Sequence, residues 1–212
     1  MSYALNEIEA TAKRAARGAG LSWGMAEEAS KAARWLCTQG FDGAALLAAV
    51  LEQSDGRPAG ELRPQSLQGE WRAASGTLCP LLAGASLSDC AARLADGRIT
   101  LQAVSHPALL LPFAAAAAAQ LGQPVTLEWD GCAAVTDGKS VSIKGEAVQQ
   151  PLTAGATASL GGTLGAPLPQ ATRATPDAAA WESLNRFARR TFAPATEASR
   201  LAGAGAGLSD ND

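Results

Sequence analysis

Two helix-forming segments, lined by small residues and separated by a glycine-rich break, constrain this chain most strongly. In each segment, apolar residues recur at the three- and four-residue spacing of a buried helical face. They are Leu5, Ile8, Ala12 and Ala15 in the first segment, and Met25, Ala29, Ala32, Ala33 and Leu36 in the second. Gly18 and Gly20 should end the first helix, because glycine tolerates the left-handed backbone of a helix terminus. Since alanine lets two helices approach closely, the sequence predicts a tight antiparallel helical hairpin.

Polar residues indicate where these two helices begin. Ser22 directly precedes the second stripe and is the expected N-cap of the second helix. Asn6, with Glu9 three residues later, has the spacing of a capping box. We therefore expect the first helix to be capped at Asn6.

The later half of the chain changes from helical spacing to the alternation of β-strands. Asp-Gly pairs separate three alternating segments, and such a pair is a strong signal for a β-hairpin. The three segments are 125–129, 132–136 and 140–144. Further strands are expected at 99–104 and 156–160, a buried turn or short strand at 79–84, and further helices at 41–52, 88–94, 109–121 and 176–190. The pattern predicts an α+β fold with an antiparallel β-meander in the later half.

The whole chain, 1–212, has the length of a single domain. Residues 161–175 are rich in Gly, Pro and Thr and predict a linker or long loop. Residues 176–212 should hold a C-terminal helix and a tail rich in Gly and Ala that folds back on the N-terminal hairpin. The alternative for the tail is a flexible chain end, which is the default for terminal residues.

Charge and hydropathy exclude two classes of partner. The net charge is −3, whereas nucleic-acid binding needs a basic face. The longest apolar run, 108–119, is too short to cross a membrane, and the first ten residues have no apolar signal core. We therefore expect a cytoplasmic protein that binds neither nucleic acid nor membrane.

The residues that usually hold metals or cofactors do not form a recognisable set. The four cysteines are scattered, and none lies at ligand spacing from His106, the only histidine. No glycine motif for a dinucleotide follows an expected strand. We expect no metal and no cofactor, and we interpret the cysteines as buried thiols.

Charged residues flank the alanine stripes where the two helices meet. Arg14 and Arg17 lie near the end of the first helix, and Glu27 and Glu28 lie in the first turns of the second. One interpretation is structural, because such charges complement the helix dipoles and stabilise each helix by about 0.3–1 kcal/mol. The other interpretation is a binding site.

In the functional hypothesis, Arg14 and Arg17 donate hydrogen bonds to a carboxylate or phosphate. Backbone amides from Ser22 onward face the same anion at the start of the second helix. Trp23 forms an apolar wall of the site. The ligand of this site would be a small anionic metabolite.

Two glutamates and the tail would complete the site. Glu27 or Glu28 would act as a catalytic acid or base if burial raises its pKa towards neutrality. Ser199 and Arg200 would line the same pocket if the tail folds back.

Two runs of residues, one near each end of the chain, carry a resemblance to a known family. The first run comprises Glu9, Ala12, Arg14, Ala15, Ala16, Arg17, Gly18, Ala19, Gly20, Ser22, Trp23, Gly24, Ala26, Glu27, Glu28 and Ala29. The second comprises Thr191, Pro194, Glu197, Ser199, Arg200, Gly203, Gly205, Gly207, Asp210, Asn211 and Asp212. These runs resemble the opening and closing signatures of an uncharacterised bacterial family that is known as a domain of unknown function. The resemblance implies no activity, but it directs attention to both ends of the chain.

Two classes of function fit these observations. The first is an enzyme or binding protein for a small anionic metabolite, which predicts that the chain ends converge on a concave pocket with desolvated charges. The second is a non-catalytic accessory or oligomerisation protein that uses the same segments as an interface, for a homo-oligomer or another partner. It predicts a flat apolar patch. The sequence leaves open whether the protein is an enzyme.

Overall fold

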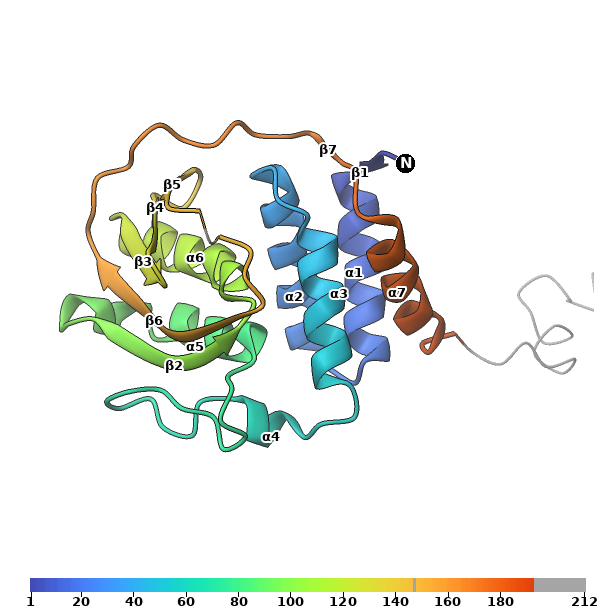
Figure 1. Ribbon diagram of the computed structural model, residues 1–212, viewed down its shortest axis with the longest axis horizontal. Coiled ribbons are helices and arrows are strands. Elements are labelled where there is room, and N and C mark those ends of the chain that lie inside the picture. The colour runs from blue at the N-terminus through green and yellow to red at the C-terminus, as the bar shows by residue number, and fades with distance from the viewer. Residues whose placement is uncertain (147, 193–212) are drawn as a thin grey trace, which may run out of the picture.

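The computed structural model describes residues 1–146 and 148–192, which form an α+β fold (Figure 1). The helices are α1 (Leu5–Gly18), α2 (Trp23–Thr38), α3 (Gly43–Ser54), α4 (Ala59–Leu62), α5 (Pro80–Asp89), α6 (Leu111–Leu121) and α7 (Ala178–Arg189), with the 3-10 turns η1 (Ala91–Ala95) and η2 (Pro107–Leu110). The strands are β1 (Tyr3–Ala4), β2 (Ile99–Ser105), β3 (Val125–Trp129), β4 (Cys132–Thr136), β5 (Val141–Lys144), β6 (Leu152–Leu160) and β7 (Arg173–Ala174).

The predicted N-terminal hairpin is the centre of a group of four helices. Helices α1 and α2 pack against each other, α7 packs on α1, and α3 contacts both α2 and α7 (Figure 1). The alanines of the two stripes are buried at this interface, with Ala12, Ala15, Ala29 and Ala33 fully inaccessible to solvent. Small side chains therefore set the short distances between these helices.

Glycine brings two further helices even closer. A Cβ atom added at Gly43 would overlap the carbonyl oxygen of Ala33, where α3 crosses α2. A Cβ atom added at Gly18 would overlap the carbonyl oxygen of Phe187 on α7. Gly18 is thus a packing residue, whereas Gly20, at a φ of 94°, takes the left-handed conformation expected after α1.

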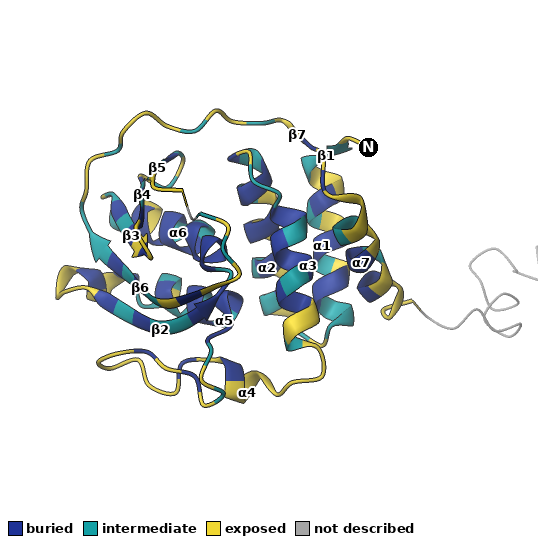
Figure 2. Ribbon diagram, in the orientation of Figure 1, coloured by how far each residue is buried: buried dark blue, intermediate teal, exposed yellow. Residues whose placement is uncertain are grey.

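The five-stranded antiparallel sheet has the order β2-β6-β3-β4-β5. Strands β3, β4 and β5 form the predicted meander, and β6 inserts between β3 and β2. Helix α6 packs on β3 and β4, and both α5 and α6 contact α2. Helices α5 and α6 lie over one face of the sheet, with the four-helix group beside them (Figure 1), and Figure 2 shows buried residues in the sheet and in both groups of helices.

Local expectations were wrong at two places. Residues 79–84, expected to form a turn or short strand, are the start of α5, because Pro80 suits the first turn of a helix. Ser88 therefore lies in the last turn of α5 and does not begin a helix. Helix α1 starts after Ala4, whose backbone N–H donates to the Glu7 carboxylate at 2.7 Å, so Asn6 is not its cap.

Residues 161–175 form a long connection from the sheet to the helices (Figure 1). The backbone N–H of Leu168 donates to the carbonyl of Val141, and that of Ala171 donates to the carbonyl of Thr38. Strand β7 then pairs with β1. This pairing joins the N-terminal residues to the segment that leads into α7.

Candidate functional site

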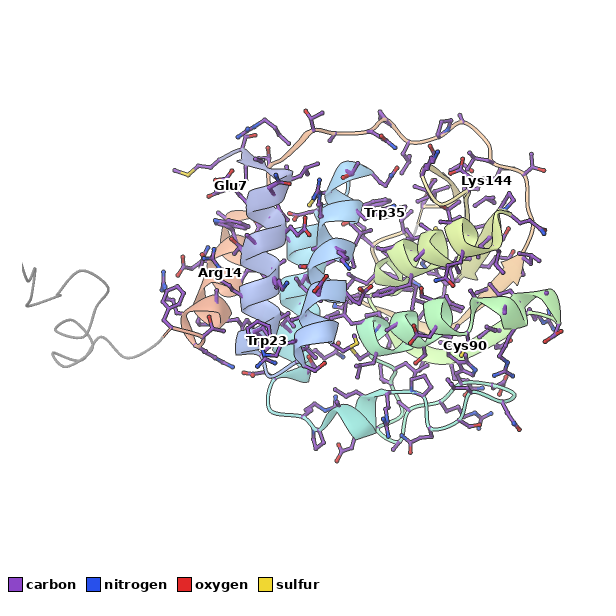
Figure 3. All side chains as sticks on the ribbon, turned by 180° about the vertical axis from the view of Figure 1, so that it is seen from behind. Glu7, Arg14, Trp23, Trp35, Cys90 and Lys144 are labelled. Carbon is purple, nitrogen blue, oxygen red and sulfur yellow. The ribbon has the colours of Figure 1, made fainter. Side chains whose placement is uncertain are left out.

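A shallow groove of about 300 Å³ runs along the exposed side of α1. Four of its lining residues come from α1 at positions that share one helical face, namely Ala10, Lys13, Arg14 and Arg17. Trp23, the first residue of α2, and Thr191, which follows α7, also line it. The groove therefore lies where the N-terminal hairpin meets the residue that follows α7. Figure 3 shows Arg14 and Trp23 on this side of the molecule.

The side chains of Arg17 and Trp23 form one unit of the groove. The guanidinium carbon of Arg17 lies 4.5 Å from the centroid of the Trp23 ring, which is a cation–π distance. Arg17 also donates a hydrogen bond to the carbonyl oxygen of Leu21, in the turn between α1 and α2. These contacts hold the indole in place, yet Trp23 is 70% exposed.

Arg14 and Lys13 supply the remaining positive charge. Arg14 is exposed and makes no ion pair or hydrogen bond with any residue that the structure describes. Lys13 lies 3.5 Å from the Glu27 carboxylate. Within residues 1–146 and 148–192, Arg14 is therefore a groove cation without a partner, available to an incoming anion.

The two candidate acid–base residues lie on the exposed side of α2. Glu27 pairs with Lys31 at 3.1 Å as well as with Lys13, and Glu28 pairs with Lys31 at 3.2 Å. The hydrogen bond from Lys31, together with the charges of Lys13 and Lys31, lowers the pKa of Glu27. This direction is opposite to the raised pKa that the acid–base hypothesis assumes, and the catalytic role of Glu27 stays a prediction.

The other predicted site residues divide between the groove and the undescribed tail. Ser22 caps α2, because its side-chain oxygen accepts a hydrogen bond from the backbone N–H of Met25 at 3.3 Å. This confirms the predicted N-cap, and Ser22 is adjacent to Trp23. Ser199 and Arg200 lie outside the described residues. The last described residues, Thr191 and Phe192, follow α7 beside the groove.

Two lining residues escaped the sequence reasoning. Ala10 shares the helical face of Arg14 and Arg17, so helical spacing alone would have identified it. Thr191 was noted only as part of the C-terminal resemblance, because nothing local to it indicates that α7 packs on α1.

His106 lies away from this groove. It adopts a left-handed backbone at φ 43° between β2 and η2. Burial lowers the pKa of its imidazole. Within the described part of the chain, no three His, Cys, Asp or Glu side chains are grouped as metal ligands.

Residues 3–79 match the model of a family described as "Protein of unknown function (DUF3726)". The matched region contains α1, α2 and α3, and every described groove residue except Thr191. Comparison with curated proteins gives no significant match. The C-terminal run that resembles the same kind of family lies beyond the matched region. Among the described residues, no helix has the length and apolar character needed to cross a membrane.

Proposed function

We propose that the protein binds a small anionic metabolite, with a carboxylate or phosphate group, in the groove along α1. The observation that carries this proposal is the exposed guanidinium of Arg14, without a partner among the described residues, in the same groove as the Arg17–Trp23 pair. An arginine donates two parallel hydrogen bonds to a carboxylate or phosphate and needs no change in protonation to do so.

The arrangement supports binding more directly than catalysis. Glu27 pairs with Lys13 and Lys31, and these two lysines lower its pKa. Glu28 is the other candidate for an acid or base, and its catalytic role also stays a prediction. The proposal therefore concerns a binding protein first and an enzyme only if turnover is found.

The C-terminal segment belongs to the proposal as a second component of the site. Thr191, near the end of the described residues, lines the groove. We propose that Ser199 and Arg200 contribute to the bound state and that the family resemblance extends to both ends of the chain. A bacterial origin and a cytoplasmic location also stay predictions.

The test is a thermal-shift screen against carboxylate and phosphate metabolites, followed by calorimetry on the ligands found. A ligand that binds only the folded protein raises its apparent stability. Arg14→Ala should remove most of the binding, because a charge-assisted hydrogen bond contributes about 1.5–3 kcal/mol. Arg98→Ala is the matched control, since Arg98 is an exposed arginine beside β2 with no ion pair among the described residues. Binding that survives Arg14→Ala unchanged contradicts the proposal.

The role of the tail is tested separately, with Ser199→Ala and Arg200→Ala in the full-length protein. Both variants should weaken binding without changing the melting temperature of the free protein. If both bind as the wild type does, the tail does not belong to the site, whereas the groove on α1 is unaffected by that result.

One observation favours a second function, an interface for a homo-oligomer or another partner. Trp23 is 70% exposed and Phe192 is 60% exposed, and tryptophan with arginine is typical of interface centres. Sedimentation analysis of the wild type and of Trp23→Ala separates the two proposals. A wild-type oligomer that Trp23→Ala dissociates supports the interface, and an unchanged monomer supports the metabolite site.

A further inference from the structure

The number of available charges in the groove limits the kind of anion that it can hold. The Arg17 guanidinium is stacked on Trp23 and bonded to the carbonyl of Leu21. Lys13 lies 3.5 Å from the carboxylate of Glu27, an exposed ion pair. Among the described residues of the groove, Arg14 is therefore the guanidinium with no ion pair or hydrogen bond, and the nearby carboxylate of Glu27 disfavours a polyanion.

The walls of the groove are predominantly apolar. The groove is lined by Ala10, Lys13, Arg14, Arg17, Trp23 and Thr191. Long cationic side chains cover apolar surface with their methylene groups while the charged end stays in water. Such a surface stabilises an apolar body by about 25 cal/mol per Å² of area removed from water.

The size of the groove agrees with a small ligand. Its volume of about 300 Å³ is at the lower end of the range of small-molecule sites, roughly 300–1,000 Å³. A ligand with one carboxylate at Arg14 and a single ring or short chain against Trp23 would use both the charge and the apolar wall.

Building on the proposed function, we infer that the ligand is a monoanionic amphiphile, a carboxylate carried on an aromatic or aliphatic body. Inorganic phosphate and tricarboxylates satisfy the charge of Arg14 and leave Trp23 uncovered. A neutral aromatic covers Trp23 and leaves Arg14 without its anion. The inference therefore requires both halves of the ligand at once.

Four probes separate these requirements in the full-length protein. Phenylacetate carries both halves, acetate lacks the ring, 2-phenylethanol lacks the charge, and citrate is a polyanion. Binding is measured by calorimetry and by the indole N–H resonance of Trp23, which Trp23→Phe identifies among the five tryptophans of the chain. Phenylacetate should bind at least about tenfold more tightly than each of the other three, a difference of about 1.4 kcal/mol.

Variants then assign the two contacts. Arg14→Ala should weaken phenylacetate binding about tenfold or more and leave 2-phenylethanol unaffected, because only the charge-assisted contact is lost. Trp23→Ala should weaken phenylacetate towards the affinity of acetate. Arg98→Ala should leave every probe unchanged.

The outcomes distinguish this inference from the proposed function on which it rests. If citrate or phosphate binds more tightly than phenylacetate and depends on Arg14, the amphiphile inference is wrong and anion binding in the groove stands. If no anion binds, or if binding does not depend on Arg14, both are wrong. Tight, Arg14-dependent phenylacetate binding with a shift of the Trp23 resonance supports both.

Discussion

The two ends of the four-helix group differ in how their polar groups are used. At the end where α3 and α7 begin, Asp42 accepts hydrogen bonds from the backbone N–H groups of Ala45 and Asp177, at 2.9 and 2.7 Å. Asp177 in turn caps α7 through the N–H of Ala180. At the other end, Arg14 has no partner among the described residues, and Trp23 is largely exposed. The first end uses Asp42 and Asp177 as helix caps, whereas the second end also presents groups without partners among the described residues.

This comparison separates stability from binding. Residues at the closed end, where Asp42 and Gly43 lie, should dominate the free energy of unfolding. Residues of the groove should hardly affect it, because exposed groups without partners contribute little to the folded state. The same substitution, made once at each end, tests whether the closed end contributes more to the free energy of unfolding than the groove does.

The largest effect is expected for Gly43→Ala. The added methyl group would overlap the backbone of Ala33, and overpacking of a well-packed interface costs about 1–3 kcal/mol, or more when backbone must shift. Gly24→Ala, in the first turn of α2, is the matched control, because apart from its chain neighbours and the nearby backbone of its own helix no atom lies within 4 Å of the added Cβ. It should be neutral or stabilising by up to about 1 kcal/mol. Urea denaturation of both variants measures the difference, and equal effects would contradict the comparison.

The next effect is expected for Asp42→Ala, which removes the acceptor for two backbone N–H groups. Loss of the cap of α3 and of the bond to Asp177 should cost about 1–3 kcal/mol. Asp42→Asn keeps one acceptor oxygen and should cost less than the alanine variant. Chemical denaturation of the pair provides the measurement, and a ranking in the opposite order would show that the two bonds do not stabilise this end.

A small effect is expected for Trp23→Ala, although tryptophan is the largest side chain. Because Trp23 is 70% exposed, its truncation should change the free energy of unfolding by no more than about 1 kcal/mol, which corresponds to loss of the exposed cation–π contact. Trp71, which is 1% exposed, is the control, and truncation of a buried tryptophan costs about 3–5 kcal/mol. Thermal denaturation of both variants compares them, and a large loss for Trp23→Ala would show that the groove is part of the core.

The smallest effect concerns pH and the surface pair that joins α3 to α7. Two hydrogen bonds from Arg190, at 2.7 and 2.9 Å, lower the pKa of the Asp55 carboxyl. A pKa that is lower in the folded state contributes stability above the unfolded value of about 4, and this contribution is lost as the pH falls through the folded value. Asp55→Asn should therefore be less stable than the wild type at pH 7.

The difference between Asp55→Asn and the wild type should shrink on acidification below about pH 4. Since both side chains of the pair are substantially exposed, solvent screening keeps the effect small. Asp89→Asn is the control, because Asp89 is exposed and makes no ion pair among the described residues. Unfolding free energies at several pH values provide the measurement, and a difference that grows with acid would contradict the assigned role of Arg190.

Sequence spacing was a reliable guide where neighbours along the chain decide the structure. The alanine stripes of α1 and α2, the cap at Ser22 and the Asp-Gly turns of the meander depend on residues within a few positions of one another. The start of α5 differs from the expected turn or strand because Pro80 suits the first turn of a helix. The β6 strand was assigned only in part, since its partners β2 and β3 lie more than twenty residues away in the sequence.

The candidate site shows the same division. Arg14, Arg17 and Trp23 were identified from the sequence, because clustered charge beside a glycine break is visible locally. The contacts between these residues cannot be identified from the sequence, because the stacking of Arg17 on Trp23 depends on the angle at which α2 leaves the turn. The lowered pKa of Glu27 arises first from Lys31, four residues along the same helix, and only the added contribution of Lys13 depends on the packing of α1 against α2.

By itself, the sequence determined the α+β class, the helical hairpin and the charged residues at its turn, because periodicity and turn chemistry act over short distances. Tertiary structure alone decided that β1 pairs with β7, that Gly18 is a contact for α7 and that Thr191 lines the groove with Arg14. These features join residues about 170 positions apart. Such contacts stabilise the protein only when the intervening chain has folded and brought the two segments together. The spacing of residues along the sequence does not predict such contacts.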